Sequence, residues 1–169
     1  SRSGMSGIIG RIYYLYQERY GAFIGHTATF ASVPCFPHNL FGVFVAGGVR
    51  IGRNCVIFQH VTIGANSLPD SQTVGVPTIG DNVYIGAGAK IIGSVSVGDN
   101  CRIGANCVVS SDVPKNSIVV LNKPRVLERK ELLLNRYYRW SPHGPLYFDD
   151  GKWILETDED IVTRLEGAL

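Results

Sequence analysis

An aliphatic residue recurs at every sixth position through the middle of the chain, and this period restricts the fold more than any other feature. The repeat forms two blocks whose aliphatic members are Val45, Ile51, Ile57, Ile63, Ile79, Ile85, Ile91, Val97, Ile103 and Val109. A small or β-branched residue follows four positions later, at Val49, Cys55, Val61, Val83, Ala89, Val95, Cys101, Cys107 and Val113. Such a repeat predicts a β-helix, in which each hexad supplies a short strand and a corner and each coil covers the next.

The period also predicts the position of each side chain. Three hexads complete one turn of a triangular prism, so the aliphatic residue points inward and the small residue lies near a corner. Gly, Asn and Asp between them accept the backbone angles of a corner. No 3.6-residue period occurs between residues 45 and 120, which argues against a helical or doubly wound fold.

Composition is consistent with one compact domain without a nucleic-acid or membrane partner. The chain has 169 residues and a net charge of +2, and no apolar stretch approaches the ~20 residues that span a bilayer. We therefore expect a soluble, cytoplasmic protein with no transmembrane segment.

The repeat divides the chain into regions. Residues 1–4 precede Met5 and are interpreted as a cloning remnant, and 5–22 as an N-terminal helical cap. Residues 23–120 are the predicted β-helix, with an inserted loop at about 65–78. Residues 121–169 form a mixed C-terminal extension, for which we expect a short helix over 131–140, a hairpin about an Asp-Gly turn and a terminal helix.

The cysteines do not indicate a metal site or a disulfide. Cys55, Cys101 and Cys107 occupy the small inward position of the repeat, where cysteine acts as a compact apolar residue. The chain has no C-x-x-C spacing, so no zinc site is predicted. Cys35 lies outside the repeat, and its role stays open.

Residues 38–126 resemble the hexapeptide-repeat acyltransferases, specifically the serine acetyltransferase branch and its relatives that O-acetylate sugars of surface polysaccharides. The matching segments are HNLFGVFV (38–45), QHVTIG (59–64), TIGDNVYIGAGAKIIGSVSVGDN (78–100), IGANCVV (103–109) and KPRV (123–126). The resemblance implies an all-β solenoid, a left-handed parallel β-helix, that transfers acetyl from acetyl-CoA. It also implies a homotrimer with active sites between neighbouring subunits.

Transfer of acetyl to a hydroxyl requires a base, and histidine has the unperturbed pKa suited to that task. The resemblance assigns this role to His38, with His60 as the second candidate because its side chain should point outward. Relatives often orient the histidine with an upstream Asp, but no Asp or Glu occurs between Glu18 and Asp70. We hypothesise that a backbone carbonyl, or a carboxylate from Asp70 or another subunit, orients His38 instead.

The resemblance also implies where acetyl-CoA binds, and no metal is expected. Small residues that leave space for the pantetheine arm, and basic residues for its phosphates, are predicted at Gly64, Ala65, Ala87, Gly88, Ala105, Lys123 and Arg125. Acceptor-binding residues are predicted at Asn39, Gln59, Asn66 and Asp70.

The acceptor is predicted from two charged features of the serine enzymes that this chain lacks. Serine enzymes of this branch usually have Asp immediately before the catalytic His and an Arg-His pair just ahead of the coil that follows the insertion. At these places this chain has Pro37 and Gly75-Val76-Pro77. Because zwitterionic serine needs charged partners, we predict a neutral sugar or polysaccharide precursor, acetylated directly in a ternary complex. The alternatives are serine O-acetylation for cysteine biosynthesis and a non-catalytic trimeric scaffold.

Overall fold

The computed structural model describes residues 7–123, 127–128, 130 and 134–168. It divides into two units, Ser1–Lys123 and Pro124–Leu169, which we call the β-helix unit and the C-terminal unit. No helix of the described residues is long and apolar enough to cross a membrane.

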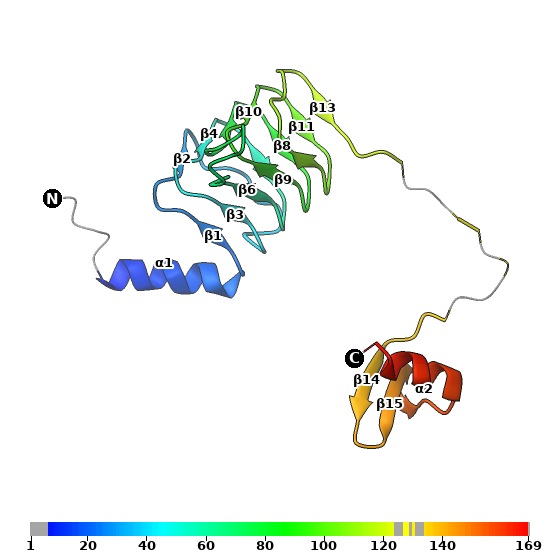
Figure 1. The fold of residues 1–169 in the computed structure, drawn as a ribbon. Coiled ribbons are helices and arrows are strands. Elements are labelled where there is room, and N and C mark those ends of the chain that lie inside the picture. Colours follow the sequence, from blue (N-terminus) through cyan, green and yellow to red (C-terminus); the bar gives the residue numbers. More distant parts are fainter. Residues whose placement is uncertain (1–6, 124–126, 129, 131–133, 169) are drawn as a thin grey trace. The chain divides into compact units, whose positions relative to one another are not determined.

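The β-helix unit consists of three parallel sheets, and successive strands enter a different sheet in turn (Figure 1). The first sheet contains β1 (Phe23–Ile24), β3 (Phe44–Val45), β6 (Thr62–Gly64), β9 (Lys90–Ile92) and β12 (Val108–Val109). The second contains β2 (Thr29–Phe30), β4 (Arg50–Ile51), β7 (Thr78–Ile79) and β10 (Ser96–Val97). The third contains β5 (Val56–Ile57), β8 (Tyr84–Ile85), β11 (Arg102–Ile103) and β13 (Ile118–Val119). This topology is a three-sided parallel β-helix, as the six-residue period predicts.

The core is a set of stacked aliphatic columns. In the third sheet Ile57 pairs with Ile85, and Ile85 with Ile103; the other two sheets repeat the arrangement. Every aliphatic position of the repeat is at most 4% exposed. The small positions are buried as well, including Cys55, whose thiol pKa is raised by that burial.

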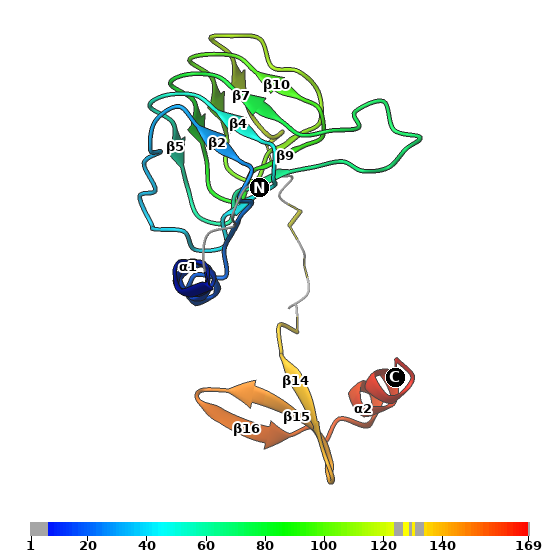
Figure 2. The ribbon, with the colours of Figure 1, turned by 90° about the vertical axis from the view of Figure 1, so that its left-hand side faces the viewer.

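Three kinds of corner join the sheets. The histidine corner, between the third and first sheets, comprises residues 36–43, 58–61, 86–89 and 104–107. The asparagine corner, between the second and third sheets, comprises residues 52–55, 80–83, 98–101 and 114–117. The loop corner, between the first and second sheets, comprises residues 46–49, 65–77, 93–95 and 110–112. Residues 65–77 project from the β-helix as a long loop (Figure 2).

A ladder of side-chain amides stabilises the asparagine corner. Asn54 donates to Asn82 (2.7 Å), Asn82 to Asn100 (3.2 Å) and Asn100 to Asn116 (3.1 Å). All four residues have a positive φ of 54–60°, a conformation that asparagine tolerates better than most residues. The same amino acid therefore makes the turn and links it to the next coil.

The helix α1 (Gly7–Arg19) is anchored to the first strand. The hydroxyl of Tyr13 donates to the carbonyl of Ile24 (2.8 Å), and the Ile24 backbone N–H donates to the buried side chain of Gln17. These bonds occupy backbone groups of β1 that would otherwise be exposed at the end of the β-helix, which is how solenoid ends are usually protected.

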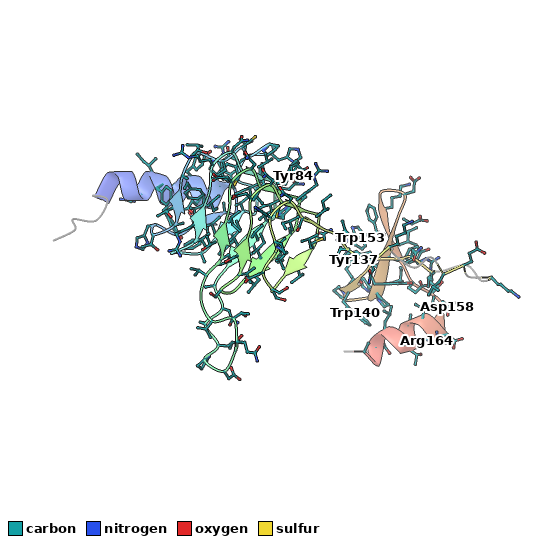
Figure 3. The ribbon with its side chains drawn as sticks, turned by 90° about the horizontal axis from the view of Figure 1, so that it is seen from above. Tyr84, Tyr137, Trp140, Trp153, Asp158 and Arg164 are labelled. Atoms are coloured by element: carbon teal, nitrogen blue, oxygen red, sulfur yellow. The ribbon has the colours of Figure 1, made fainter. Side chains whose placement is uncertain are left out.

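The C-terminal unit is an antiparallel sheet of β14 (Tyr138–Ser141), β15 (Gly144–Asp149) and β16 (Lys152–Leu155), followed by α2 (Glu159–Glu166). The turn between β15 and β16 uses positive φ at Asp150 and Gly151. Asp158 accepts backbone hydrogen bonds from the first turn of α2, which is N-capping (Figure 3).

The prediction of a short helix over 131–140 is wrong for its last three residues. Residues 138–141 form a strand instead, because Tyr138 pairs with Tyr147 and Trp140 with Pro145 across β15. Aromatic residues fit such a pleated, half-buried surface well. Residues 131–133 lie outside the described part of the chain.

Glu156 is the polar centre of the C-terminal unit. Its buried carboxylate accepts hydrogen bonds from the Tyr138 hydroxyl and the Arg136 guanidinium, each at 2.8 Å, and from the backbone N–H of Asp158 at 3.1 Å. The Tyr138 hydroxyl first, and then the Asp158 N–H and Arg136, hold the pKa of Glu156 below its ordinary value.

We expect Ile85→Ala to lower the free energy of unfolding by about 2–5 kcal/mol, because it leaves a cavity in a stacked column. Ile118→Ala is the matched control, since Ile118 lies in the same sheet but is 64% exposed. Urea unfolding followed by far-ultraviolet circular dichroism measures both. Equal losses in the two variants would contradict the described burial.

We expect the stability of the C-terminal unit to fall with acid through Glu156. A lowered folded-state pKa stabilises the unit above the unfolded value of about 4.3, and this stabilisation is lost as pH falls through the folded pKa. Trp140 and Trp153 are the only tryptophans of the chain, so urea unfolding followed by tryptophan fluorescence reports on this unit alone. Glu156→Gln should be less stable than the parent at pH 7 and lose less on acidification, whereas the exposed Glu166→Gln should behave as the parent.

Candidate active site

His38 lies on the first passage of the histidine corner, which is longer than the later ones. Residues 36–43 make this passage, whereas 58–61 make the next. A turn holds His38 in place, with the Asn39 N–H donating to the Phe36 carbonyl (3.1 Å) and Asn39 at a φ of 56°. The side chains of His38 and Asn39 are both exposed. The extra length therefore carries a solvent-accessible imidazole over the following coil.

The His38 ring is held by two residues of that following coil. Nδ1 of His38 lies 2.7 Å from Oε1 of Gln59, and the ring meets Phe58 edge-on at a centroid distance of 5.6 Å. Phe58 in turn packs against Tyr84 at 5.1 Å, and Tyr84 lies on the outer surface of the third sheet (Figure 3). A row of rings thus supports the histidine.

Within the chain, the group at the His38 ring is neither of the two that our hypothesis named there, and a carboxylate of another subunit stays a hypothesis. The structure places a side-chain amide, that of Gln59, at the ring nitrogen rather than a backbone carbonyl or Asp70. Among the described residues, no carboxylate hydrogen-bonds to His38. Gln59, predicted as an acceptor-binding residue, therefore contacts the histidine directly.

His60 occupies the turn position of the same corner. It has a φ of 59°, and its N–H donates to the Phe41 carbonyl (2.8 Å). Its exposed ring covers Gly42, where an added Cβ would lie 2.2 Å from Nδ1 of His60. Lys90 donates to the His60 carbonyl (2.7 Å) and the Gly88 carbonyl (2.9 Å). His60 thus closes the corner between two coils.

Three of the residues predicted to bind acetyl-CoA lie on the histidine corner. Ala87 and Ala105 occupy the position of Gln59 in the next two coils, because Ile57, Ile85 and Ile103 are in register. Gly88 has a φ of 72°, and an added Cβ would lie 2.1 Å from Oδ1 of Asn106. This corner therefore presents small side chains in line with His38.

The remaining predicted residues lie elsewhere in the chain. Gly64 ends β6, and Ala65 begins the long loop of the loop corner. Asn66 stabilises that loop: its amide donates to Ser71 (2.7 Å) and Thr73 (3.2 Å). Asp70 is exposed in the same loop. Within one chain, these residues are therefore separated from His38 by the width of the first sheet.

One of the two residues predicted to bind the coenzyme phosphates lies in the described part of the chain. Lys123 is exposed at the end of the β-helix unit, and Arg125 lies outside the described residues. No three His, Cys, Asp or Glu side chains of the described ranges come together as a metal-binding group.

Sequence reasoning missed the pairing of His38 with Gln59. The available signal was the contrast between Gln59 and the alanines at the equivalent positions 87 and 105. The pairing was hidden because residues 36–43 depart from the hexad, so the period could not place His38 over a particular residue of the next coil.

Fold and site together define a class, a three-sided parallel β-helix of hexapeptide repeats with an accessible histidine at one corner. The family model described as Bacterial transferase hexapeptide (six repeats) matches residues 77–111. This stretch contains all the aliphatic positions of the repeat from Ile79 to Val109.

The particular relatives are serine acetyltransferases. The chain is 35% identical over 140 residues to the enzyme of Mycobacterium tuberculosis, a match that covers 83% of this chain and 57% of that protein. It is 40% identical over 88 residues to the enzyme of Synechococcus elongatus, covering 52% of this chain and 35% of that protein.

Solved structures similar to this chain are also serine acetyltransferases. Serine acetyltransferase isoform 3 of Entamoeba histolytica, in complex with cysteine, matches with a TM-score of 0.62 and 30% identity over 73% of this chain and 43% of that one. The Neisseria gonorrhoeae enzyme, in complex with serine, matches with a TM-score of 0.56 and 35% identity over 68% and 49%. The chain therefore spans roughly half the length of these relatives, and the resemblance to the serine acetyltransferase branch of the hexapeptide-repeat acyltransferases is confirmed.

These relatives contradict the predicted sugar acceptor and the assignment to polysaccharide biosynthesis. They are serine acetyltransferases, which was the alternative. The prediction depended on missing charges at Pro37 and at residues 75–77, and such absences do not exclude that other groups bind the ammonium and carboxylate of serine.

We expect Gly88→Ala to destabilise the β-helix unit more than Gly21→Ala. Both glycines have a positive φ, which costs a residue with a side chain about 1–2 kcal/mol. Only at Gly88 would the new Cβ also collide with Asn106, whereas at Gly21 nothing lies within 4 Å. Urea unfolding followed by circular dichroism tests this, and equal losses would show that Asn106 moves aside freely.

Proposed function

We propose that this chain is an acetyl-CoA-dependent O-acetyltransferase that acetylates the hydroxyl of a small molecule, with L-serine as the acceptor. The observation that carries the proposal is an exposed His38, oriented by Gln59, in line with the small residues Ala87 and Gly88 on one corner. The similarity to serine acetyltransferases supports both the reaction and the acceptor.

In the proposed reaction His38 acts as the general base. It removes the proton of the acceptor hydroxyl while the oxygen attacks the thioester carbonyl of acetyl-CoA. Backbone N–H groups stabilise the charge that develops on the carbonyl oxygen. The tetrahedral intermediate then collapses, the C–S bond breaks, and the imidazolium returns its proton to the departing coenzyme A thiolate. The acetyl group passes directly from coenzyme A to the acceptor, without an acetyl-enzyme intermediate. This is consistent with the hydrogen bond of the His38 ring, which is to an amide and not to a nucleophilic cysteine or serine.

The donor would lie along the histidine corner, where Ala87, Gly88 and Ala105 leave room for the pantetheine arm. Gly64, at the end of β6, and Ala65, the first residue of the loop corner, lie on the other side of the first sheet in the same chain. The two groups of residues can line one cleft if the histidine corner of one copy faces the loop corner of a neighbour. This separation supports a homotrimer of left-handed β-helices with active sites between subunits. In that arrangement Asn66 and Asp70 belong to the neighbour's wall of the site, and Lys123 and Arg125 would bind the phosphates.

Recognition of serine in this chain differs from the pattern of related enzymes. Pro37 and residues 75–77 offer no charge beside the site, whereas the acceptor carries an ammonium and a carboxylate. A site with fewer charged contacts distinguishes less sharply between L-serine and analogues that lack one of those charges. We therefore propose that the enzyme discriminates only moderately between L-serine and such analogues. Asn39, which follows the base in the sequence, is the proposed polar contact of the acceptor.

We expect thiol release from acetyl-CoA in the presence of L-serine, and a loss of at least about 100-fold in His38→Ala, because one general base contributes 10²–10⁴-fold. His60→Ala should retain more activity than His38→Ala. Release with L-serine, L-serinamide and 2-aminoethanol, measured in parallel, tests the acceptor. Full activity of His38→Ala would remove this residue from the mechanism, and binding of coenzyme A without any release would favour a non-catalytic scaffold.

A further inference from the structure

We propose that Gln59 is the positioning residue of His38 and makes Nε2 the basic nitrogen of the ring. The inference rests on the proposed function, because it specifies how the base of that reaction is held. It also explains how this chain orients a histidine without a carboxylate within hydrogen-bonding reach among its described residues.

The hydrogen-bonding chemistry determines the tautomer. The oxygen of a glutamine side chain can only accept, and a neutral imidazole carries a single N–H. With Oε1 of Gln59 at 2.7 Å from Nδ1, the proposed tautomer carries its proton on Nδ1 and its lone pair on Nε2. The opposite orientation of the amide would donate to Nδ1 and leave Nε2 protonated, which would abolish its basicity.

Gln59 is held firmly enough to act in this way. Its carbonyl accepts from the Gly88 N–H (3.0 Å), and the preceding Phe58 N–H donates to the Ile85 carbonyl (3.1 Å). The same Phe58 contacts the His38 ring at an interplanar angle of 86°. The backbone of the positioning residue is therefore bonded to the following coil, and the neighbouring ring restricts the imidazole from a second direction.

A neutral positioning residue has a consequence that an anionic one lacks. A carboxylate fixes the ring and also stabilises its protonated form, whereas an amide fixes the ring without adding charge. The pH at which the base becomes protonated should then depend on whether residue 59 carries a charge. This dependence separates positioning from a merely structural role.

Activity of three variants tests the proposal. Gln59→Glu should move the acidic limb of the kcat/KM profile upward by about one pH unit or more, because the new carboxylate favours the protonated ring. Gln59→Met, which keeps the length but not the hydrogen bond, should lower kcat about tenfold with little change in KM for acetyl-CoA. Lys115→Gln is the control: it changes the net charge by the same amount on another corner and should leave the profile in place.

A second measurement does not require activity. Nitrogen-15 spectra of histidine-labelled protein, with the His38 signals assigned by their loss in His38→Ala, should show Nδ1 protonated in the neutral ring of the parent and not preferentially so in Gln59→Met. A proton on Nε2 in the parent, or an unmoved acidic limb in Gln59→Glu, would overturn the proposal. If the parent released no thiol, the proposed function would fail, and the spectra alone would decide the role of Gln59.

Discussion

Burial of one aliphatic side chain from every hexad is the interaction on which the rest of this structure depends. A single coil cannot cover its own inner face, so each coil is stable only when the next lies on it in register. The register aligns Ile57, Ile85 and Ile103, and the outward residues between them are aligned as a result. The outward side chains within the regular repeat, such as Gln59, Ala87 and Ala105, therefore have places that the buried column determines.

The candidate site arises where this regularity is interrupted. The longer passage over 36–43 allows His38 to rest on Phe58 and Gln59 of the following coil, while Gln59 itself stays within the regular repeat. A mobile base would be a poor catalyst, because catalytic groups must be held close to their productive geometry. Here a long corner turn packs against a coil of the regular repeat, and the pair combines solvent access with an imidazole held by two contacts.

The sequence was most informative where the period applied and less informative where it stopped. The three sheets, the buried aliphatic positions and the inward cysteines follow from the hexad alone, because one spacing decides inward from outward. The partner of His38 did not follow, since residues 36–43 lie outside the hexad. The strand at residues 138–141 was mistaken for a helix because its pairing partner, not its local pattern, decides its structure. The acceptor was misjudged because the missing charges at Pro37 and residues 75–77 were given more weight than the branch to which the chain is similar.

The amide ladder of the asparagine corner gives the β-helix a polarity. Each amide nitrogen from Asn54 to Asn100 donates toward the later coil, and each oxygen from Asn82 to Asn116 receives from the earlier one. The dipoles of these amides consequently point the same way and reinforce one another along the corner. Conversion of one inner asparagine to aspartate by chemical ageing would place an acceptor where a donor is needed. Such a change at Asn82 or Asn100 would weaken the link between neighbouring coils without removing a side chain of the hydrophobic core.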